Sequence, residues 1–92
     1  MPIGRIRHKG LRELFDTGRT GRIAAPLQGK ALLILDLLDN MESPADCRGV
    51  CKFHALAGDR AGSFAFAVSK NWRLTFVWRQ GMADDVDFED YH

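Results

Sequence analysis

Cysteine is scarce in this sequence, and no stretch of it is apolar for long. The two cysteines, Cys47 and Cys51, are too few and too close together for the disulfide framework of a small secreted domain. The longest apolar run, Ala31 to Leu35, falls far short of the roughly 20 residues that a membrane-spanning helix needs. No apolar leader follows Met1, so we expect a cytoplasmic protein without a membrane role.

The composition also lacks the bias of a disordered or a strongly charged chain. Hydrophobic residues make up 46% and charged residues 27% of the 92 residues, and the formal net charge is +1. That balance is typical of a soluble globular protein. A chain of this length has room for one hydrophobic core, so we expect residues 1–92 to form a single domain.

The charges are unevenly placed along the chain. Residues 1–30 carry seven lysines or arginines against two acids, whereas residues 84–90 carry five acids and no base. The fold must therefore bring opposite charges together or expose two faces of opposite sign.

Hydrophobic spacing predicts two helices in the first half of the chain. Residues 8–15 have apolar side chains at helical spacing, and Thr17-Gly18 should end that helix. A longer and largely buried helix should run from Pro26 to Asn40, since an apolar stripe repeats through it and Leu33 widens that stripe. The loop at 18–25 is glycine-rich and basic, but it lacks the spacing of a phosphate-binding P-loop, so a plain loop is favoured.

The second half of the chain changes to a period of two, which is typical of strands. Strands are expected at 50–56, 63–68, 72–78 and 83–88, joined by tight turns, and residues 2–7 make at best a short edge strand. Helices followed by hairpin-linked strands predict an α+β fold, with two N-terminal helices packed on one face of a mainly antiparallel sheet of about four strands.

Alternation along these strands assigns the two faces of the sheet. The aromatic positions should meet the long helix, which leaves a polar set on the open face. The C-terminal end of the chain adds further polar groups near that face. The expected open-face residues are Lys52, His54, Arg73, Thr75 and Arg79, and the terminal ones are Asp90, Tyr91 and His92.

This polar set matches the needs of RNA cleavage by internal transfer. A base takes the 2′-hydroxyl proton, a cation neutralises the phosphorane and an acid protonates the leaving 5′-oxygen, so no metal is needed. Arginine offers a two-pronged donor to phosphate, and tyrosine stacks on a base. Plainer interpretations remain open. His54 is equally an ordinary exposed histidine, Arg73 a partner of a C-terminal acid, and residues 90–92 a frayed tail.

A zinc site is a further alternative, because Cys47, Cys51 and His54 cluster and His8 or His92 would complete four ligands. The spacing argues against it. The two cysteines lack the spacing of a zinc ribbon, and in a strand Cys51 and His54 point to opposite faces.

Several short motifs, in order along the chain, resemble one family. Asp90-Tyr91-His92 ends the series. The other motifs are His8-Lys9-Gly10-Leu11, Leu14-Phe15, Thr17-Gly18, Phe53-His54 with Leu56, Gly58-Asp59-Arg60, and Asn71-Trp72-Arg73-Leu74-Thr75-Phe76. In this order, over essentially the whole length, the chain resembles the HigB toxins of the RelE-like group of ribosome-dependent mRNA interferases.

The resemblance implies a RelE-like fold and a toxin that cuts mRNA in the A site of the small ribosomal subunit, without a cofactor. It also implies a HigA-type helix-turn-helix antitoxin, through which the complex would reach DNA indirectly. By position, His54, Asp90, Tyr91 and His92 match the family's active-site residues, and Arg73 matches the basic residue aimed at phosphate. Their compatible roles are a proton-transfer pair of histidines, an orienting aspartate, a nucleotide-positioning tyrosine and an arginine that stabilises transition-state charge.

Contacts to RNA and the ribosome are expected from basic residues outside the catalytic set. The sequence departs from the family's pattern in one respect, since Ala57 and Ala61 stand where basic residues are common. Fewer phosphate contacts should weaken RNA binding and attenuate the toxin. The expected RNA- or ribosome-binding residues are Lys9, Arg12, Arg19, Arg22, Lys52, Arg60 and Arg79.

Two other functions remain open. The chain would be a non-catalytic RNA- or ribosome-binding module if it kept the fold without the chemistry. It would be a protein-interaction domain if its aromatic and leucine-rich surfaces served only one protein partner. A neighbouring reading frame for a helix-turn-helix protein would favour the toxin.

Overall fold

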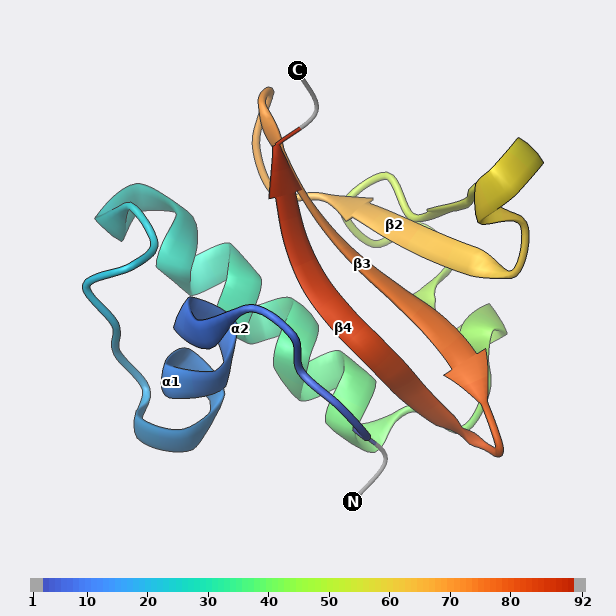
Figure 1. Cartoon of the computed structure of the whole chain (residues 1–92), viewed down its shortest axis with the longest axis horizontal. Helices are drawn as coiled ribbons and strands as arrows, with labels where there is room; N and C mark the ends of the chain where they lie inside the picture. The colour runs from blue at the N-terminus through green and yellow to red at the C-terminus, as the bar shows by residue number, and fades with distance from the viewer. Residues whose placement is uncertain (1–2, 91–92) are drawn as a thin grey trace.

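The computed structural model describes residues 3–90. Four antiparallel strands form one sheet in the order β1-β2-β3-β4, and both α-helices lie on the same side of it (Figure 1). The predicted α+β, RelE-like arrangement is confirmed. Within residues 3–90, neither helix has the length and apolar character to cross a membrane. The elements are α1 (Lys9–Thr17), α2 (Ala25–Asn40), β1 (His54–Ala55), β2 (Ser63–Ala67), β3 (Trp72–Arg79) and β4 (Met82–Asp90), with 3-10 turns η1 (Pro44–Cys47) and η2 (Gly58–Arg60).

The core lies between α2 and the aromatic face of the sheet, as the alternation predicts. Ile34 and Leu35 of α2 have no exposed surface, and neither does Phe66 of β2. Each fully buried side chain of this size contributes roughly 1.5–3 kcal/mol relative to an exposed one. The prediction for Leu33 is wrong, because this side chain is 59% exposed and lies outside the buried stripe of α2.

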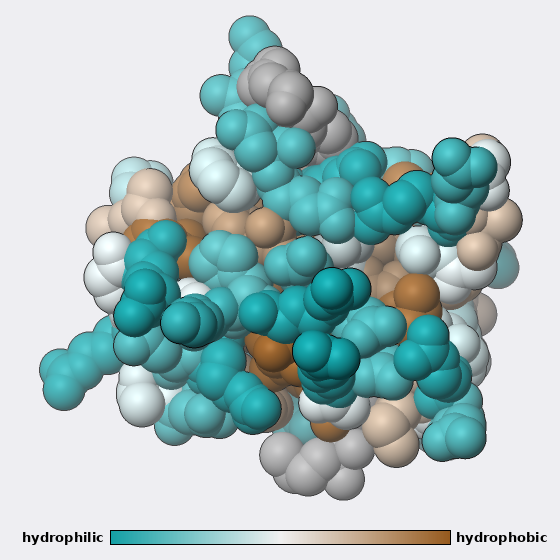
Figure 2. Space-filling view, viewed as in Figure 1, coloured by the Kyte–Doolittle hydropathy of each residue, from teal (hydrophilic) through white to brown (hydrophobic). Residues whose placement is uncertain are grey.

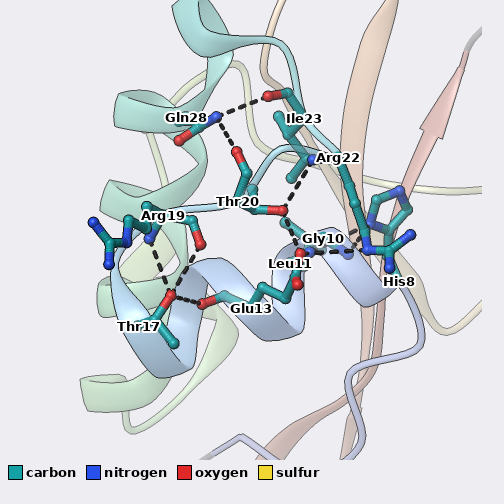
Figure 3. Close-up of polar contacts among 10 residues, drawn as sticks. All are labelled: His8, Gly10, Leu11, Glu13, Thr17, Arg19, Thr20, Arg22, Ile23 and Gln28. Atoms are coloured by element: carbon teal, nitrogen blue, oxygen red, sulfur yellow. Dashed lines mark hydrogen bonds and ion pairs between the residues drawn. The ribbon is translucent and has the colours of Figure 1, made fainter.

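Helix α1 begins at an unusual cap and ends at an ordinary one. The Nδ1 atom of His8 accepts hydrogen bonds from the backbone N–H groups of Gly10 (3.0 Å) and Leu11 (3.3 Å), as Figure 3 shows. It thereby satisfies two of the N–H groups that a helix start leaves without partners. At the other end, Gly18 adopts the left-handed conformation (φ 85°) that only glycine takes at little cost.

Side chains fasten the loop between the two helices to α1 and α2 (Figure 3). The Thr20 hydroxyl donates to Glu13 (2.6 Å) and accepts from the backbone N–H of Arg22. Gln28 of α2 donates to the carbonyl groups of Thr20 and Ile23, at 2.8 Å each. The loop is therefore an ordered structural connection, and its threonine hydroxyl is already bonded within the protein.

The His8 cap makes the stability of the fold depend on pH. Burial lowers the pKa of His8 from its ordinary value of 6.5, and nearby Arg22 lowers it further although Asp87 raises it. Below that value the unfolded chain takes up a proton that the folded chain resists. The stabilisation is therefore full above about pH 6.5 and is lost as the pH falls. Urea unfolding at about pH 7.5 and 5.5 should show a larger loss for the parent than for His8→Asn, which keeps a cap without a titrating ring. Equal losses would contradict this role.

The expected strand at 50–56 is the main error in the sequence prediction. Only His54–Ala55 pair with β2. Cys51 (φ 45°) and Lys52 (φ 55°) have left-handed backbones, which break the alternation that their side chains suggest. Residues 3–7 likewise form no strand and make two isolated parallel bridges beside β4, Ile3 to Ala83 and Ile6 to Val86.

A bulge in β4 sets which of its residues face the core. Thr75 pairs with Asp87 but Val77 pairs with Asp84, so β4 has one extra residue, and Asp85 takes a positive φ of 47° there. Because of the extra residue, the alternation of side chains after the bulge again points the apolar residues of β4 toward the core, as it does before the bulge. Asp84, Asp87 and Glu89 are thereby kept toward the open face.

Candidate active site

His54 and Arg73 lie on the same face of the sheet. His54 of β1 pairs with Ala65 of β2, and Ala65 pairs with Thr75 of β3, so these three residues form a row across the open face. Arg73 is two residues from Thr75 on β3 and therefore shares that face. His54 and Thr75, at the two ends of this row, are two strand spacings apart, which is roughly 10 Å. The expected placement of these two residues on one face is confirmed.

The His54 side chain is exposed, and its ring is held from one side. The Nδ1 atom lies 2.9 Å from the carbonyl oxygen of Lys52, which favours the tautomer with the proton on Nδ1. The left-handed turn at Cys51 and Lys52 brings that carbonyl toward the ring. In this tautomer Nε2 is the acceptor, as a general base requires.

Glu89 of β4 forms the centre of a polar network on the open face. Arg60 binds its carboxylate with two nitrogens, at 3.1 and 2.8 Å. Arg73 donates to Oε1 from Nε and Nη2, at 3.3 and 3.2 Å, and the Thr75 hydroxyl donates to Oε2 at 3.1 Å. Two guanidinium groups are therefore held side by side by one acid.

The hydrogen bond from Arg60 is the largest influence on Glu89 and lowers the pKa of its carboxyl group, although burial acts in the opposite direction. The same bond raises the pKa of Arg60. Because the folded carboxyl has a pKa below its ordinary value of 4.5, the unfolded chain takes up a proton first as the pH falls. The network therefore stabilises the fold above that pH and loses this effect below it.

Glu89 is absent from the residues that the sequence predicts for the site. The predicted final strand, 83–88, ended one residue before it, whereas β4 continues to Asp90. The signal was present in the alternation, because the residue after the inward-facing Phe88 must face outward, and Arg73 is its partner in the register. The proposed ion pair of Arg73 with a C-terminal acid is thus found, and it coexists with the placement of Arg73 on the candidate catalytic face.

A cavity of about 200 Å³ lies on this face beside the network. Its charged lining residues are Arg7, Arg60, Asp85, Asp87 and Glu89. Acids and bases therefore meet here, as the uneven charge distribution along the chain requires. The side of the molecule seen in Figure 2 is mostly hydrophilic, with hydrophobic areas between the polar groups.

Arg79 lies at the other end of β3 and is bound to acids. Its guanidinium contacts Asp84 at 3.1 Å and Asp85 at 3.6 Å. The pKa of Asp84 is lowered mainly by the backbone N–H of Arg5, with the N–H of Asp85 next. Arg79 is thus on the open face as expected, but it is far along β3 from Arg73.

The C-terminal residues are described only as far as Asp90. Asp90 pairs with Trp72 at the end of β4, which places it at the same end of the sheet as Arg73. By alternation the Asp90 side chain points to the same face as Phe88 and to the opposite face from Glu89. It is therefore directed away from the Arg73 side of the sheet. Tyr91 and His92, which complete the predicted catalytic set, lie outside the described residues.

The remaining basic residues gather on a second surface. Lys9, Arg12 and Arg22 border a hollow of about 290 Å³ beside α1, together with Arg7 and Glu13. Arg22 is bound to Glu13 at 3.3 Å, and Arg19 is exposed on the loop that follows α1. Lys9, Arg12 and Arg22 form a basic patch beside α1, and Arg7 lies both in this patch and in the lining of the open-face cavity.

The proposed zinc ligands are not brought together. Within residues 3–90, no three histidines, cysteines or acids are arranged to hold a metal ion. Cys47 is fully buried, and burial raises the pKa of its thiol to about 11, which disfavours the thiolate that zinc binds.

Comparison with known proteins agrees with this arrangement. Residues 4–92 match the family model of HigB-like toxins, described as the RelE-like toxin of the type II toxin-antitoxin system HigB. The chain is 35% identical over 91 residues to a protein of Proteus vulgaris named Endoribonuclease HigB, covering 98% of this chain and 99% of that protein. The matched residues include the strands that carry His54 and Arg73. The chain therefore belongs to the HigB-like family of RelE-like toxins of type II toxin-antitoxin systems.

Proposed function

We propose that residues 1–92 form one toxin domain with endoribonuclease activity, which cuts mRNA in the ribosomal A site. The observation that carries the proposal is the placement of His54 and Arg73 on one open face, in a register fixed by β1, β2 and β3. The name of the Proteus vulgaris relative supports the activity. Dependence on the ribosome, the A site and a cytoplasmic location are part of the proposal.

The proposed reaction is an internal transfer that needs no metal. One histidine of the pair His54 and His92 takes the 2′-hydroxyl proton, and the 2′-oxygen attacks the adjacent phosphorus. The other histidine gives a proton to the departing 5′-oxygen, which leaves a 2′,3′-cyclic phosphate and a 5′-hydroxyl group. Arg73 stabilises the phosphorane charge and Tyr91 stacks on the nucleotide.

Glu89 fits this reaction as the residue that holds Arg73. It binds the guanidinium through Nε and Nη2, so the side chain is already ordered on the open face before RNA arrives. An ordered donor loses less entropy when it meets the phosphate. Glu89 is a positioning residue in this scheme and does not contact the reacting atoms.

Partners follow from the family and from the basic surfaces. A type II toxin has an antitoxin, and we assign this role to a helix-turn-helix protein of the HigA type, which would bind DNA on behalf of the complex. We assign the ribosomal contact to the basic patch at Lys9, Arg12 and Arg22, and to Arg19 on the loop after α1. Arg60, through its place beside Arg73, and Lys52, beside His54, are assigned to the mRNA.

Primer extension on a reporter message tests the proposed function. The parent chain and a variant lacking His92 are induced in parallel, and the 5′ ends of the message are mapped. Cleavage by the parent that is lost without His92 is expected. Cleavage by neither would favour a non-catalytic RNA- or ribosome-binding module, and identical cleavage by both would remove His92 from the site.

Ala57→Lys should raise the toxicity of the chain. Ala57 is exposed and immediately precedes η2, which carries Arg60 onto the open face. A lysine here would add one phosphate contact, worth about 0.7 in the salt dependence of binding to a single strand. Growth after induction measures the effect, with Ala57→Gln as the uncharged control. Equal growth inhibition by the two variants would reject the idea that this position attenuates the toxin.

A further inference from the structure

A hollow of about 460 Å³ is lined by three lysines. Lys30 comes from α2, Lys52 from the turn before β1 and Lys70 from the turn between β2 and β3. The other lining residues, from the same turns and the end of β2, are Cys51, Ala67, Val68 and Ser69. None of the lining residues is acidic, in contrast to the cavity on the open face.

The backbone holds Lys52 beside the candidate active site. The amide of Ala67 donates to the carbonyl of Cys51 at 2.8 Å, which ties the turn before β1 to the end of β2. The carbonyl of the next residue, Lys52, is the one that contacts His54. Lys52 therefore both lines the hollow and contacts His54, the proposed general base or acid.

The third lysine is linked to the other side of the site. The amides of Val68 and Ser69 both donate to the carbonyl of Trp72, at 3.0 and 3.1 Å, and Ser69 Oγ accepts from the Trp72 amide at 3.2 Å. These bonds fix the turn that bears Lys70. Trp72 in turn pairs with Asp90, so this turn lies beside the end of β4, from which the C-terminal residues continue.

We propose that this three-lysine hollow binds backbone phosphates of the RNA strand next to the scissile bond. The inference rests on the proposed function and adds a binding subsite to it. The volume lies within the range of about 300–1,000 Å³ of small-molecule pockets, enough to admit a nucleotide. Lysine ammonium groups bind phosphate oxygens without reading sequence, so the subsite would grip any message.

A protein segment fits the hollow less well than RNA does. Interfaces between proteins are poor in lysine and rely on aromatic or large apolar anchors. No aromatic side chain is among the lining residues, whose apolar members are Ala67 and Val68 apart from the thiol of Cys51. Three converging cations without an acid among the lining residues suit the phosphate backbone.

The first test measures binding with cleavage prevented. The probe is a short 2′-O-methyl RNA oligonucleotide of mixed sequence, which lacks the nucleophilic hydroxyl group. The variant Lys30→Gln/Lys70→Gln is compared with Arg5→Gln/Arg48→Gln, which removes the same charge at exposed positions outside this hollow. We expect about tenfold weaker binding for the lysine variant and a salt dependence shallower by about 0.7 to 1.4, with little change for the control.

The second test reports from inside the hollow. Cys51 is partly exposed and lines it, whereas Cys47 is buried and serves as the unreactive control. The oligonucleotide should slow alkylation of Cys51 by iodoacetamide several-fold in the parent and much less in the lysine variant. If an acidic peptide protected Cys51 as strongly as RNA does, the hollow would be a binding site for a protein partner, and the proposal would be overturned.

The outcomes separate this subsite from the enzyme function. Equal loss of binding in both double variants, no loss in either, or no binding by the parent at low ionic strength would each overturn the subsite. A parent that cuts reporter mRNA while the lysine variant binds normally would leave the enzyme without this subsite. A parent that binds and protects Cys51 but cuts nothing would keep the subsite and refute the enzyme.

Discussion

His54→Ala should slow cleavage of a reporter message by about 10² to 10⁴, because a general acid or base contributes that much to the rate. The loss should appear with little change in stability. The His54 side chain is exposed, and within residues 3–90 its ring is held by a hydrogen bond with the carbonyl of Lys52. Cleavage on ribosomes, timed by primer extension, measures the rate, and thermal unfolding measures the stability.

His8→Asn is the matched control for this experiment. His8 is the other described histidine, but it caps α1 and contacts Phe88 edge-on at 5.5 Å, away from the open face. The control should therefore cleave at the parent rate. Parent-level cleavage by His54→Ala, or an equal loss in both variants, would remove His54 from the chemistry.

Arg73→Gln should reduce cleavage by about 10² to 10³, the usual cost of removing one donor that stabilises transition-state charge. Arg60→Gln is its control, because both arginines bind the same carboxylate of Glu89. Each variant leaves that carboxylate with one guanidinium, so each should lose about 0.5–1 kcal/mol of stability. The rates, measured on ribosomes, should differ although the stabilities are similar.

Arg60→Gln should reduce the rate of cleavage at most severalfold, because Arg60 is expected to contact the RNA backbone. Equal loss of rate in the two variants would mean that the ion-pair network as a whole is needed and that Arg73 has no special place at the phosphate. Gln removes the charge and shortens both side chains by the same amount, so changes in packing should be alike in the two variants.

Periodicity predicts most of this fold because the two periods are physically distinct. The apolar stripe of α2 and the alternation in β2 and β3 each bury one side of an element. The turn at Cys51 and Lys52 escapes such reasoning. Its residues alternate in hydropathy like those of a strand, and their left-handed backbone is unfavourable for non-glycine residues. No local sequence pattern therefore predicts this turn.

The site was predicted only in part, for similar reasons. Alternation correctly places His54 and Arg73 on one face, while their chemical roles came from the family resemblance. Glu89 was missed because the final strand was ended too early. The lysine hollow was missed because Lys30, Lys52 and Lys70 lie on three different elements, and only the tertiary fold brings such residues together.

The most direct measurement is a structure of the protein on a ribosome whose A-site codon carries 2′-O-methyl groups. The phosphate to be cut should lie within hydrogen-bond reach, about 3 Å, of Arg73 and of His54 or a water bound to it. His92 should face the same phosphate from the other side. A phosphate bound away from the open face, or His54 and His92 on opposite sides of the molecule, would contradict the proposed active site.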